Sequence, residues 1–233
     1  MRLSLIAASL LTAFLATPAL AQEAAPLTGN LSFTNNYLFR GITQTDDKPA
    51  LQGGFDYGHA SGFYAGTWAS NISWLNSRTD GDGNDVRTKS SLEWDVYGGY
   101  KFSAGPVAFD VGALQYFYPG AKVSGAEDAD TTELYAAASW KWFTAKYSHA
   151  VTNLFGVENS KNSYYPELNF AMDVGSGFTA SAHVGRQHVK GGGSYNDWKV
   201  GVSKELFGVT VGAYYVDTDI SEPRGVVSVG KTF

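Results

Sequence analysis

The four histidines of this chain, and the serines near them, are the residues whose types could carry hydrolytic chemistry. Ser148, His149 and Asn153 lie close in sequence, and such side chains serve as nucleophile, base and orienting group in some hydrolases. Ser148 and His149 are adjacent on a predicted strand, so they point to opposite faces and cannot pair with each other. A serine from a neighbouring strand stays open as a partner. We predict that the chain is not an enzyme and assign no catalytic residue, with a hydrolase as an alternative.

An acidic segment is the one candidate for metal binding. Residues 80–85, Asp-Gly-Asp-Gly-Asn-Asp, resemble the first half of a calcium loop. An EF-hand loop that began at Asp80 would need glycine at position 85 and glutamate at position 91, where this chain has Asp85 and Ser91. We expect a solvated loop, with weak binding of calcium or bridging to lipopolysaccharide as the alternative. The absence of cysteine excludes disulfides, thiolate metal sites and cysteine nucleophiles, and no cofactor is expected.

The composition indicates β-structure. The 233 residues include 27 Gly, 6 Trp, 14 Tyr and 14 Phe, and only 17% are charged, which is too few charges for a coiled coil or a disordered acidic chain. The formal net charge of −5 argues against a nucleic-acid partner, which usually requires a basic face. The expected class is all-β.

A two-residue alternation of apolar and polar side chains runs through most of the chain. In 89–102, for example, Leu92, Trp94 and Val96 share one face, and Glu93 and Asp95 share the other. The pattern predicts strands that are longer than the 5–6 residues typical of soluble proteins and that match the about 9–11 residues needed to cross a membrane. The predicted strands are 29–40, 50–59, 62–76, 89–102, 105–118, 132–141, 143–153, 164–174, 177–189, 196–205, 207–217 and 225–233.

The connections between these strands alternate in length. Those after odd-numbered strands are long and polar, whereas those after even-numbered strands are short. This alternation is typical of a transmembrane barrel with short periplasmic turns and longer external loops. We therefore predict a transmembrane antiparallel β-barrel of twelve strands with both termini in the periplasm. Aromatic residues near strand ends, among them Tyr37, Phe39, Trp74 and Tyr118, are interpreted as girdles at the membrane interfaces.

The N-terminus has the features of an export signal. A basic start at Arg2, an apolar run over 3–15, Pro18 and the small residues of 19–21 predict a signal peptide over 1–21. Residues 22–28 are expected to form a short periplasmic segment and 29–233 a single barrel domain. The predicted location is the bacterial outer membrane.

The polar faces of the strands define an expected lumen. Acidic side chains outnumber basic ones there, and a lumen lined by one sign of charge concentrates counter-ions. We therefore predict a channel that weakly prefers cations or neutral solutes. The predicted lumen-lining residues are Arg40, Asp56, Glu93, Asp95, Asp110, Lys146, Glu167 and Lys199.

Several segments resemble the TorF-type porin family of proteobacterial outer-membrane proteins. The similar segments are 35–45 (NNYLFRGITQT), 49–57 (PALQGGFDY), 61–71 (SGFYAGTWASN) and 93–100 (EWDVYGGY), and the resemblance runs from about 29 to the C-terminus. The terminal strand, which ends on Phe233, looks like the signal that the barrel-insertion machinery recognises, although Lys231 stands where an aromatic residue is commoner. The resemblance implies an outer-membrane, porin-like protein and transfers no catalytic residue.

The expected function is passive diffusion of small solutes. The alternatives are a structural or adhesive barrel with a plugged lumen and, third, a hydrolase in the barrel wall. The expected partners are outer-membrane lipids and lipopolysaccharide, the barrel-insertion machinery and small solutes.

Overall fold

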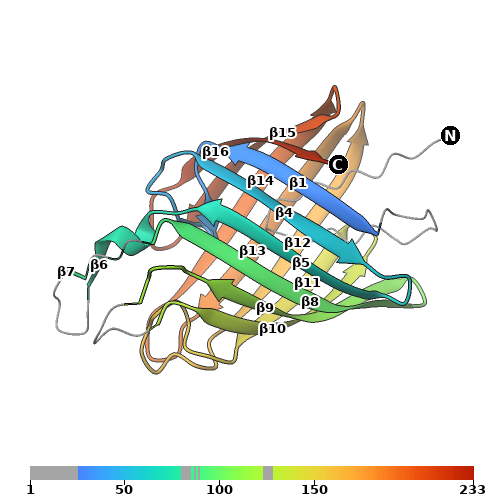
Figure 1. Cartoon of the computed structure of the whole chain (residues 1–233). Helices are drawn as coiled ribbons and strands as arrows, with labels where there is room; N and C mark the ends of the chain where they lie inside the picture. Colours follow the sequence, from blue (N-terminus) through green and yellow to red (C-terminus); the bar gives the residue numbers. More distant parts are fainter. Residues whose placement is uncertain (1–25, 80–84, 87, 89, 123–127) are drawn as a thin grey trace.

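The computed structural model of the chain describes residues 26–233 except 80–84, 87, 89 and 123–127. Twelve antiparallel strands form a closed barrel (Figure 1). These strands are β1 (Leu27–Thr34), β4 (Ala50–Gly58), β5 (Phe63–Asn71), β8 (Leu92–Ala104), β9 (Val107–Phe117), β10 (Thr131–Trp140), β11 (Phe143–Ala150), β12 (Tyr164–Gly175), β13 (Phe178–His188), β14 (Ser194–Leu206), β15 (Val209–Thr218) and β16 (Arg224–Thr232). The prediction of a twelve-stranded antiparallel barrel is confirmed.

Each strand of the wall pairs with its neighbours along the chain, and β1 closes the ring against β16. Beyond the last ladder pair, Gly29 and Phe233 exchange two backbone hydrogen bonds of 2.7 and 2.9 Å. The Phe233 ring covers Gly29, where a Cβ would approach the ring to 2.7 Å. The C-terminal aromatic residue therefore lies at the seam of the barrel.

The period-2 pattern sorts side chains between two faces as predicted. On β8, Trp94 is 44% exposed on the outer face, whereas Glu93 and Asp95 are 1% and 0% exposed on the inner face. The same alternation places Val200 and Val202 of β14 outside. Closure of the sheet pairs the backbone groups of every strand with a neighbour, so an apolar outer face can lie in hydrocarbon.

Short turns gather at one end of the barrel and longer loops at the other (Figure 1). The turns join β4 to β5, β8 to β9, β10 to β11, β12 to β13 and β14 to β15, and the last of them consists of Phe207 and Gly208 at φ 52° and 80°. A two-residue hairpin turn requires such positive φ angles. Because Leu27 pairs with Tyr57, β1 begins at the short-turn end.

The first predicted strand was too long. β1 ends at Thr34 instead of residue 40, and residues 35–49 fold back into the barrel with two short strands, β2 (Leu38–Phe39) and β3 (Ile42–Thr43). Asn35 ends β1, because its side-chain amide donates to the Gly225 carbonyl (3.2 Å) and its Oδ1 accepts from the Val227 N–H (2.7 Å). The strand begins at Leu27, inside the segment 22–28 that we expected to precede the barrel.

Other boundaries also differ from the predictions. β5 ends at Asn71, and a short 3₁₀-helix, η1 (Trp74–Ser77), and two short paired strands, β6 (Arg78–Thr79) and β7 (Asp85–Val86), follow it. β11 ends at Ala150 rather than at residue 153. The predicted signal peptide and residues 80–84 of the calcium-like segment lie outside the described residues. Among the helices of the described residues, none has the length and apolarity required to cross a membrane.

Candidate functional site

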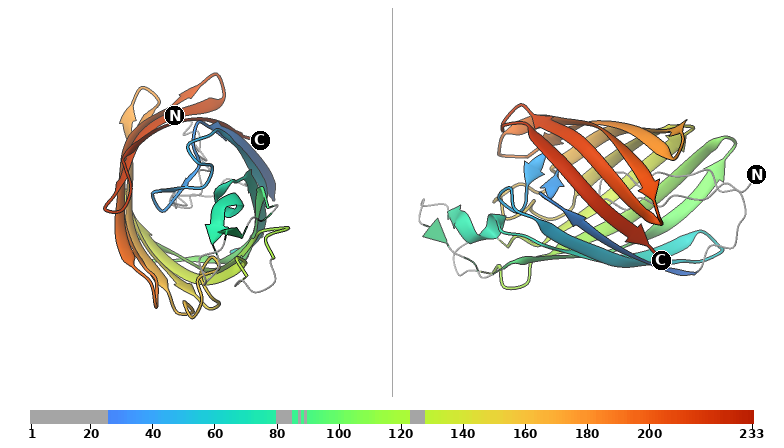
Figure 2. Two further views of the ribbon diagram at one scale, coloured as in Figure 1. Left: turned by 90° about the vertical axis from the view of Figure 1, so that its left-hand side faces the viewer. Right: turned by 90° about the horizontal axis from the view of Figure 1, so that it is seen from above.

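The segment 35–49, which we call the inward loop, enters the barrel from the long-loop end (Figure 2). Its β2–β3 hairpin turns at Arg40 and Gly41, which have φ angles of 47° and 79°. Arginine is rarely found at positive φ, and such a conformation persists only where surrounding contacts hold it. The contacts of Arg40 supply that support.

Arg40 anchors the tip of the inward loop. Its Nη1 and Nη2 bind the two carboxylate oxygens of Glu133 on β10 at 3.0 and 2.8 Å, and Nη1 also donates to Gln187 Oε1 on β13 at 2.7 Å. The guanidinium lies 4.7 Å from the ring centre of Phe39 and 4.3 Å from that of Tyr165. Burial lowers the pKa of Arg40, but the charge of Glu133 outweighs it and the net pKa is raised. Arg40 is therefore a permanent cation in a buried pair.

Gly41 brings the tip against the other wall of the barrel. A Cβ at this position would clash with Thr218 Cγ2 and would lie 2.9 Å from Asp197 Cβ. Glycine is thus required both by the positive φ and by the close approach to β14 and β15. The inward loop, which starts at the end of β1, therefore reaches across the lumen.

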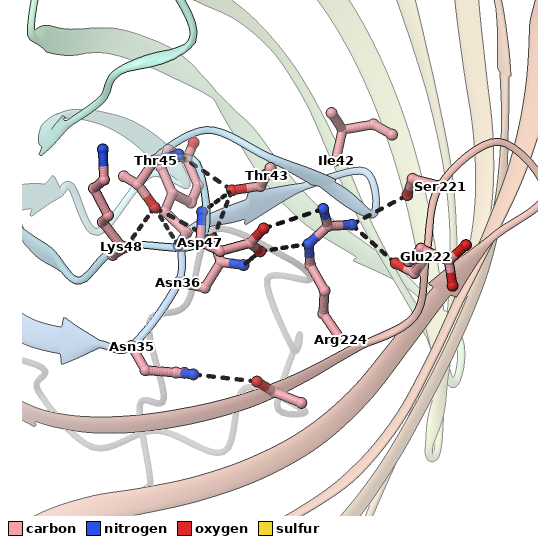
Figure 3. A network of polar contacts seen from close by, with 12 residues as sticks. Asn35, Asn36, Ile42, Thr43, Thr45, Asp47, Lys48, Ser221, Glu222 and Arg224 are labelled. Atoms are coloured by element: carbon pink, nitrogen blue, oxygen red, sulfur yellow. Dashed lines mark hydrogen bonds and ion pairs between the residues drawn. The ribbon is translucent and has the colours of Figure 1, made fainter.

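The root of the inward loop is held by a polar network (Figure 3). Asp47 Oδ1 accepts from Arg224 Nε of β16 at 2.5 Å and from Asn36 Nδ2 at 2.6 Å. Asn36 Oδ1 accepts from the hydroxyls of Thr43 (2.7 Å) and Thr45 (3.2 Å). The hydrogen bond from Arg224 lowers the pKa of Asp47. These bonds tie both ends of the loop to the start of β16.

An aromatic cluster fills the lumen on one side of the inward loop. Tyr37 packs edge-on against Trp68 of β5 with ring centres 5.5 Å apart, and Phe39 meets Tyr116 of β9 and Phe155 at 5.7 and 5.5 Å. Further residues of this cluster are Ile72, Trp74, Leu75, Leu114 and Tyr118. Tyr37, Phe39, Trp74 and Tyr118, which we interpreted as interfacial girdle residues, therefore pack inside the barrel, and that interpretation was wrong.

Phenol groups cover several of the acidic residues that we predicted for the lumen. Tyr97 donates to Asp56 Oδ1 at 2.6 Å, and Tyr64 donates to Asp110 Oδ1 at 2.6 Å. Glu93 and Asp95 lie beneath the aromatic cluster and are considered further below. The predicted acids on β4, β8 and β9 thus lie on the side of the inward loop that the cluster occupies.

A cleft remains on the other side of the inward loop, toward β13–β16. Its walls include Gln52, His183, Lys199, Tyr214, Val216 and Val226. The cleft combines hydrogen-bonding, charged and apolar side chains. Such a mixed lining suits small polar solutes of several kinds and is not specialised for one ligand.

His183 is the centre of a hydrogen-bonded network in this wall. Its Nδ1 lies 2.7 Å from Asn169 Oδ1, and its Nε2 lies 2.9 Å from both Asp197 Oδ2 and the Tyr165 hydroxyl. Glu167 Oε2 lies 3.6 Å from His183 Nδ1. This network fixes the imidazole within the wall.

The predicted lumen lysines lie near the same wall. Lys146 and Glu167 are register partners on β11 and β12, and the Lys146 Nζ lies 4.7 Å from the centre of the Tyr135 ring. The Lys199 Nζ lies 5.3 Å from the ring centre of Tyr214. Charges of both signs therefore lie on the inner faces of β11, β12 and β14.

The structure does not assemble a hydrolase from Ser148 and His149. Ser148 is buried, and His149 bonds to Tyr147 and Asn162 on the outer face, each at 3.2 Å. The Ser194 hydroxyl lies 3.0 Å from His188 Nδ1. In the described part of the chain, however, no carboxylate lies within ion-pair distance of the His188 imidazole. The described residues also contain no group of three or more His, Asp or Glu side chains placed to hold a metal ion.

The fold and the site together define a closed twelve-stranded β-barrel whose polar lumen is crossed by an inward loop. The model of a family described as a bacterial protein of unknown function (Gcw_chp) matches residues 19–232, and the chain belongs to this family. This family name differs from the TorF-type name that the sequence segments suggested. No protein with a curated function matches the sequence significantly.

Solved porin structures share the fold. A KdgM porin superposes with a TM-score of 0.59 at 9% identity, covering 88% of this chain and 99% of that one. A KdgM porin in complex with disordered oligogalacturonate gives 0.57 at 8% identity, with 89% and 98% covered. The outer membrane protein Omp33 of Acinetobacter baumannii gives 0.52 at 8% identity, with 89% and 97% covered. At such identities the similarity concerns the fold.

Proposed function

We propose that the chain is a porin-like channel of the bacterial outer membrane through which small solutes diffuse passively. The observation that carries this proposal is the cleft between the inward loop and β13–β16, which lies inside a closed barrel with an apolar outer face. The resemblance of 35–45 to TorF-type porins and the fold shared with KdgM and Omp33 support it. Residues 1–21 would direct export, the short-turn end and both termini would face the periplasm, and Phe233 would serve the insertion machinery.

The solutes that we propose are neutral or cationic. The KdgM structure is a complex with oligogalacturonate, an acidic sugar. In this chain the inward-pointing guanidinium groups of Arg40 and Arg224 are bound to Glu133 and Asp47, and a lumen for acidic sugars would require arginines without carboxylate partners. In the cleft wall, the positive charge of Lys199 offsets much of the negative charge of the nearby Glu167 and Asp197. The proposed cation preference is therefore weak, and it should fade as salt screens the charges.

Planar-bilayer recording of the refolded protein tests the proposal. Discrete conductance steps are expected, and reversal potentials in a KCl gradient should show a slight preference for potassium. The substitution Asp197→Asn, in the wall of the cleft, should move the reversal potential toward anion preference. A refolded, heat-modifiable barrel that produces no steps would contradict the channel.

A structural barrel with a plugged lumen is the second candidate. The contacts of Arg40 with β10 and β13 and of Gly41 with β14 and β15 favour it, because the inward loop reaches from wall to wall. Deletion of 37–45 separates the two candidates. A plugged barrel would conduct only after the deletion, whereas the channel that we propose conducts before it and conducts more after it.

A further inference from the structure

Glu93 and Asp95 form a pair of buried carboxylates beneath the inward loop. They are two residues apart on β8, so both side chains point into the lumen. The Glu93 oxygens accept from the hydroxyls of Tyr37 (2.8 Å) and Tyr118 (3.3 Å). Asp95 is 0% exposed, and neither of its carboxylate oxygens has a hydrogen-bond partner among the described residues. Asp95 is thus a buried acceptor without a donor.

An unpaired buried carboxylate is costly, and such groups in folded proteins nearly always bind a donor or a cation. Asp95 also interacts electrostatically with two carboxylates, those of Glu93 and Glu133. The guanidinium of Arg40 is engaged with Glu133 at 2.8 and 3.0 Å. The cation of the inward loop is therefore taken by Glu133, and among the described residues no side-chain cation forms an ion pair with Glu93 or Asp95.

The surroundings of Asp95 suit a cation. Its register partners are Trp68 on β5 and Tyr116 on β9, and Tyr37 of the inward loop packs against Trp68. Aromatic faces and phenol oxygens attract small cations. The described residues provide no set of three or more metal-ligating side chains, so a monovalent ion fits this pair better than a transition metal does.

We propose that Glu93 and Asp95 bind one monovalent inorganic cation, Na⁺ or K⁺, beneath Tyr37 of the inward loop. The bound ion supplies the positive charge that Asp95 lacks and stabilises the packing of Tyr37 over β8. The proposal rests on the barrel and the docked loop and does not require conduction, so the bilayer experiment above and the ion experiment below can fail separately.

Thallium(I) tests the site directly, because it replaces K⁺ and scatters X-rays anomalously. Crystals of the refolded full barrel soaked in a thallium salt should show an anomalous peak within contact distance of the Asp95 carboxylate. The peak should disappear in Asp95→Asn. It should persist in Asp56→Asn, a matched control that removes another lumenal carboxylate held by a tyrosine hydroxyl. The wild-type measurement is decisive even where a variant does not fold.

Thermal unfolding provides a second readout. At equal ionic strength, the wild-type barrel should unfold several degrees higher in KCl than in N-methylglucamine chloride, and the difference should vanish in Asp95→Asn and remain in Asp56→Asn. The proposal is overturned if wild-type crystals with a docked loop show no thallium at Asp95. It is equally overturned if infrared spectra assign Asp95 a protonated carboxyl band that K⁺ does not change.

Discussion

The guanidinium of Arg40 and the carboxylate of Glu133 form a two-bond ion pair across the barrel lumen, at 3.0 and 2.8 Å. Arg40 lies at the tip of a loop that follows β1, whereas Glu133 lies on β10, on another part of the wall. Both side chains are buried. Breaking a buried pair by removing one partner costs about 3–5 kcal/mol, because the other charge is left without compensation. This pair therefore holds the tip of the inward loop across the lumen, in addition to the aromatic cluster and the network at the root of the loop.

Substitution of Arg40 by Met should release the loop tip. Single-channel conductance should rise, and proteolysis within 35–49 should become faster. The double variant Arg40→Met, Glu133→Met removes both charges and should recover part of the lost docking energy. The control Arg186→Met, at an exposed residue on the outer face of β13, should leave conductance unchanged. Unchanged conductance in Arg40→Met would contradict the assignment of the loop as the constriction.

Gly41→Ala tests the approach of the tip to β14 and β15. The new methyl group would clash with Thr218 and Asp197, so the tip should shift and alter the conductance. Gly191→Ala is the matched control, because Gly191 has a similar φ of 75° and a Cβ there would meet nothing within 4 Å. Both substitutions incur about 1–2 kcal/mol of backbone strain. Only Gly41→Ala should change the current, and equal effects would indicate strain alone.

The root of the inward loop should loosen in acid. The hydrogen bond from Arg224 lowers the pKa of Asp47, so the folded state favours the ionised form. Its stabilisation is present above the unfolded pKa of about 3.9 and is lost as the pH falls through the lower folded value. Protection factors of the amides in 43–48, which correct for the intrinsic pH dependence of exchange, should therefore be high at neutral pH and fall below about pH 4.

In the variant Asp47→Asn, these amides should have low protection factors at every pH, and the acid transition should be lost. Asp46→Asn is the control, because the neighbouring carboxylate bonds to Ser73 instead of Arg224. An unchanged transition in Asp47→Asn would assign the pH dependence to another group.

The outer face should tolerate charge only near the ends of the strands. Val200→Arg, in the middle of β14, should destabilise the barrel by about 2–4 kcal/mol, because arginine is poorly solvated at the bilayer midplane. Val174→Arg lies on the same face beside the turn that joins β12 to β13 and should cost only about 0–1 kcal/mol. Urea titration in lipid vesicles measures both free energies of unfolding. A smaller loss for Val200 than for Val174 would contradict the placement of the membrane.

The sequence was sufficient to predict the wall of the barrel. In a strand with lipid on one side and a polar lumen on the other, apolar and polar side chains must alternate at every residue. The residue types of Trp94 and Glu93 therefore predict which face each side chain occupies, without information about the neighbouring strands. The alternating lengths of the connections then follow from the up-and-down topology. These are local patterns, and most of them lay within a few residues of the observed bounds.

The inward loop could not be predicted in the same way. Tyr37 and Phe39 are apolar enough for lipid and equally suited to packing inside a barrel, and their spacing continued the period of β1. The dipeptide Arg40-Gly41, between Leu38-Phe39 and Ile42-Thr43, was a turn signal. The residues that Arg40 contacts, Glu133, Gln187 and Tyr165, are more than 90 residues away in the chain. A single sequence does not indicate which residues at such a separation come into contact.

The orientation of the barrel in the membrane is the last prediction. The natural chain contains no cysteine, so single cysteines report one position each. We expect Lys161→Cys, Gly192→Cys and Ile220→Cys, all in exposed loops at the long-loop end, to react with a membrane-impermeant maleimide on intact cells. Ser61→Cys and Ser176→Cys lie in exposed turns at the opposite end and should react only after the outer membrane is permeabilised. The reverse pattern would place the short turns outside and would contradict periplasmic termini, because β1 begins beside the β4–β5 turn.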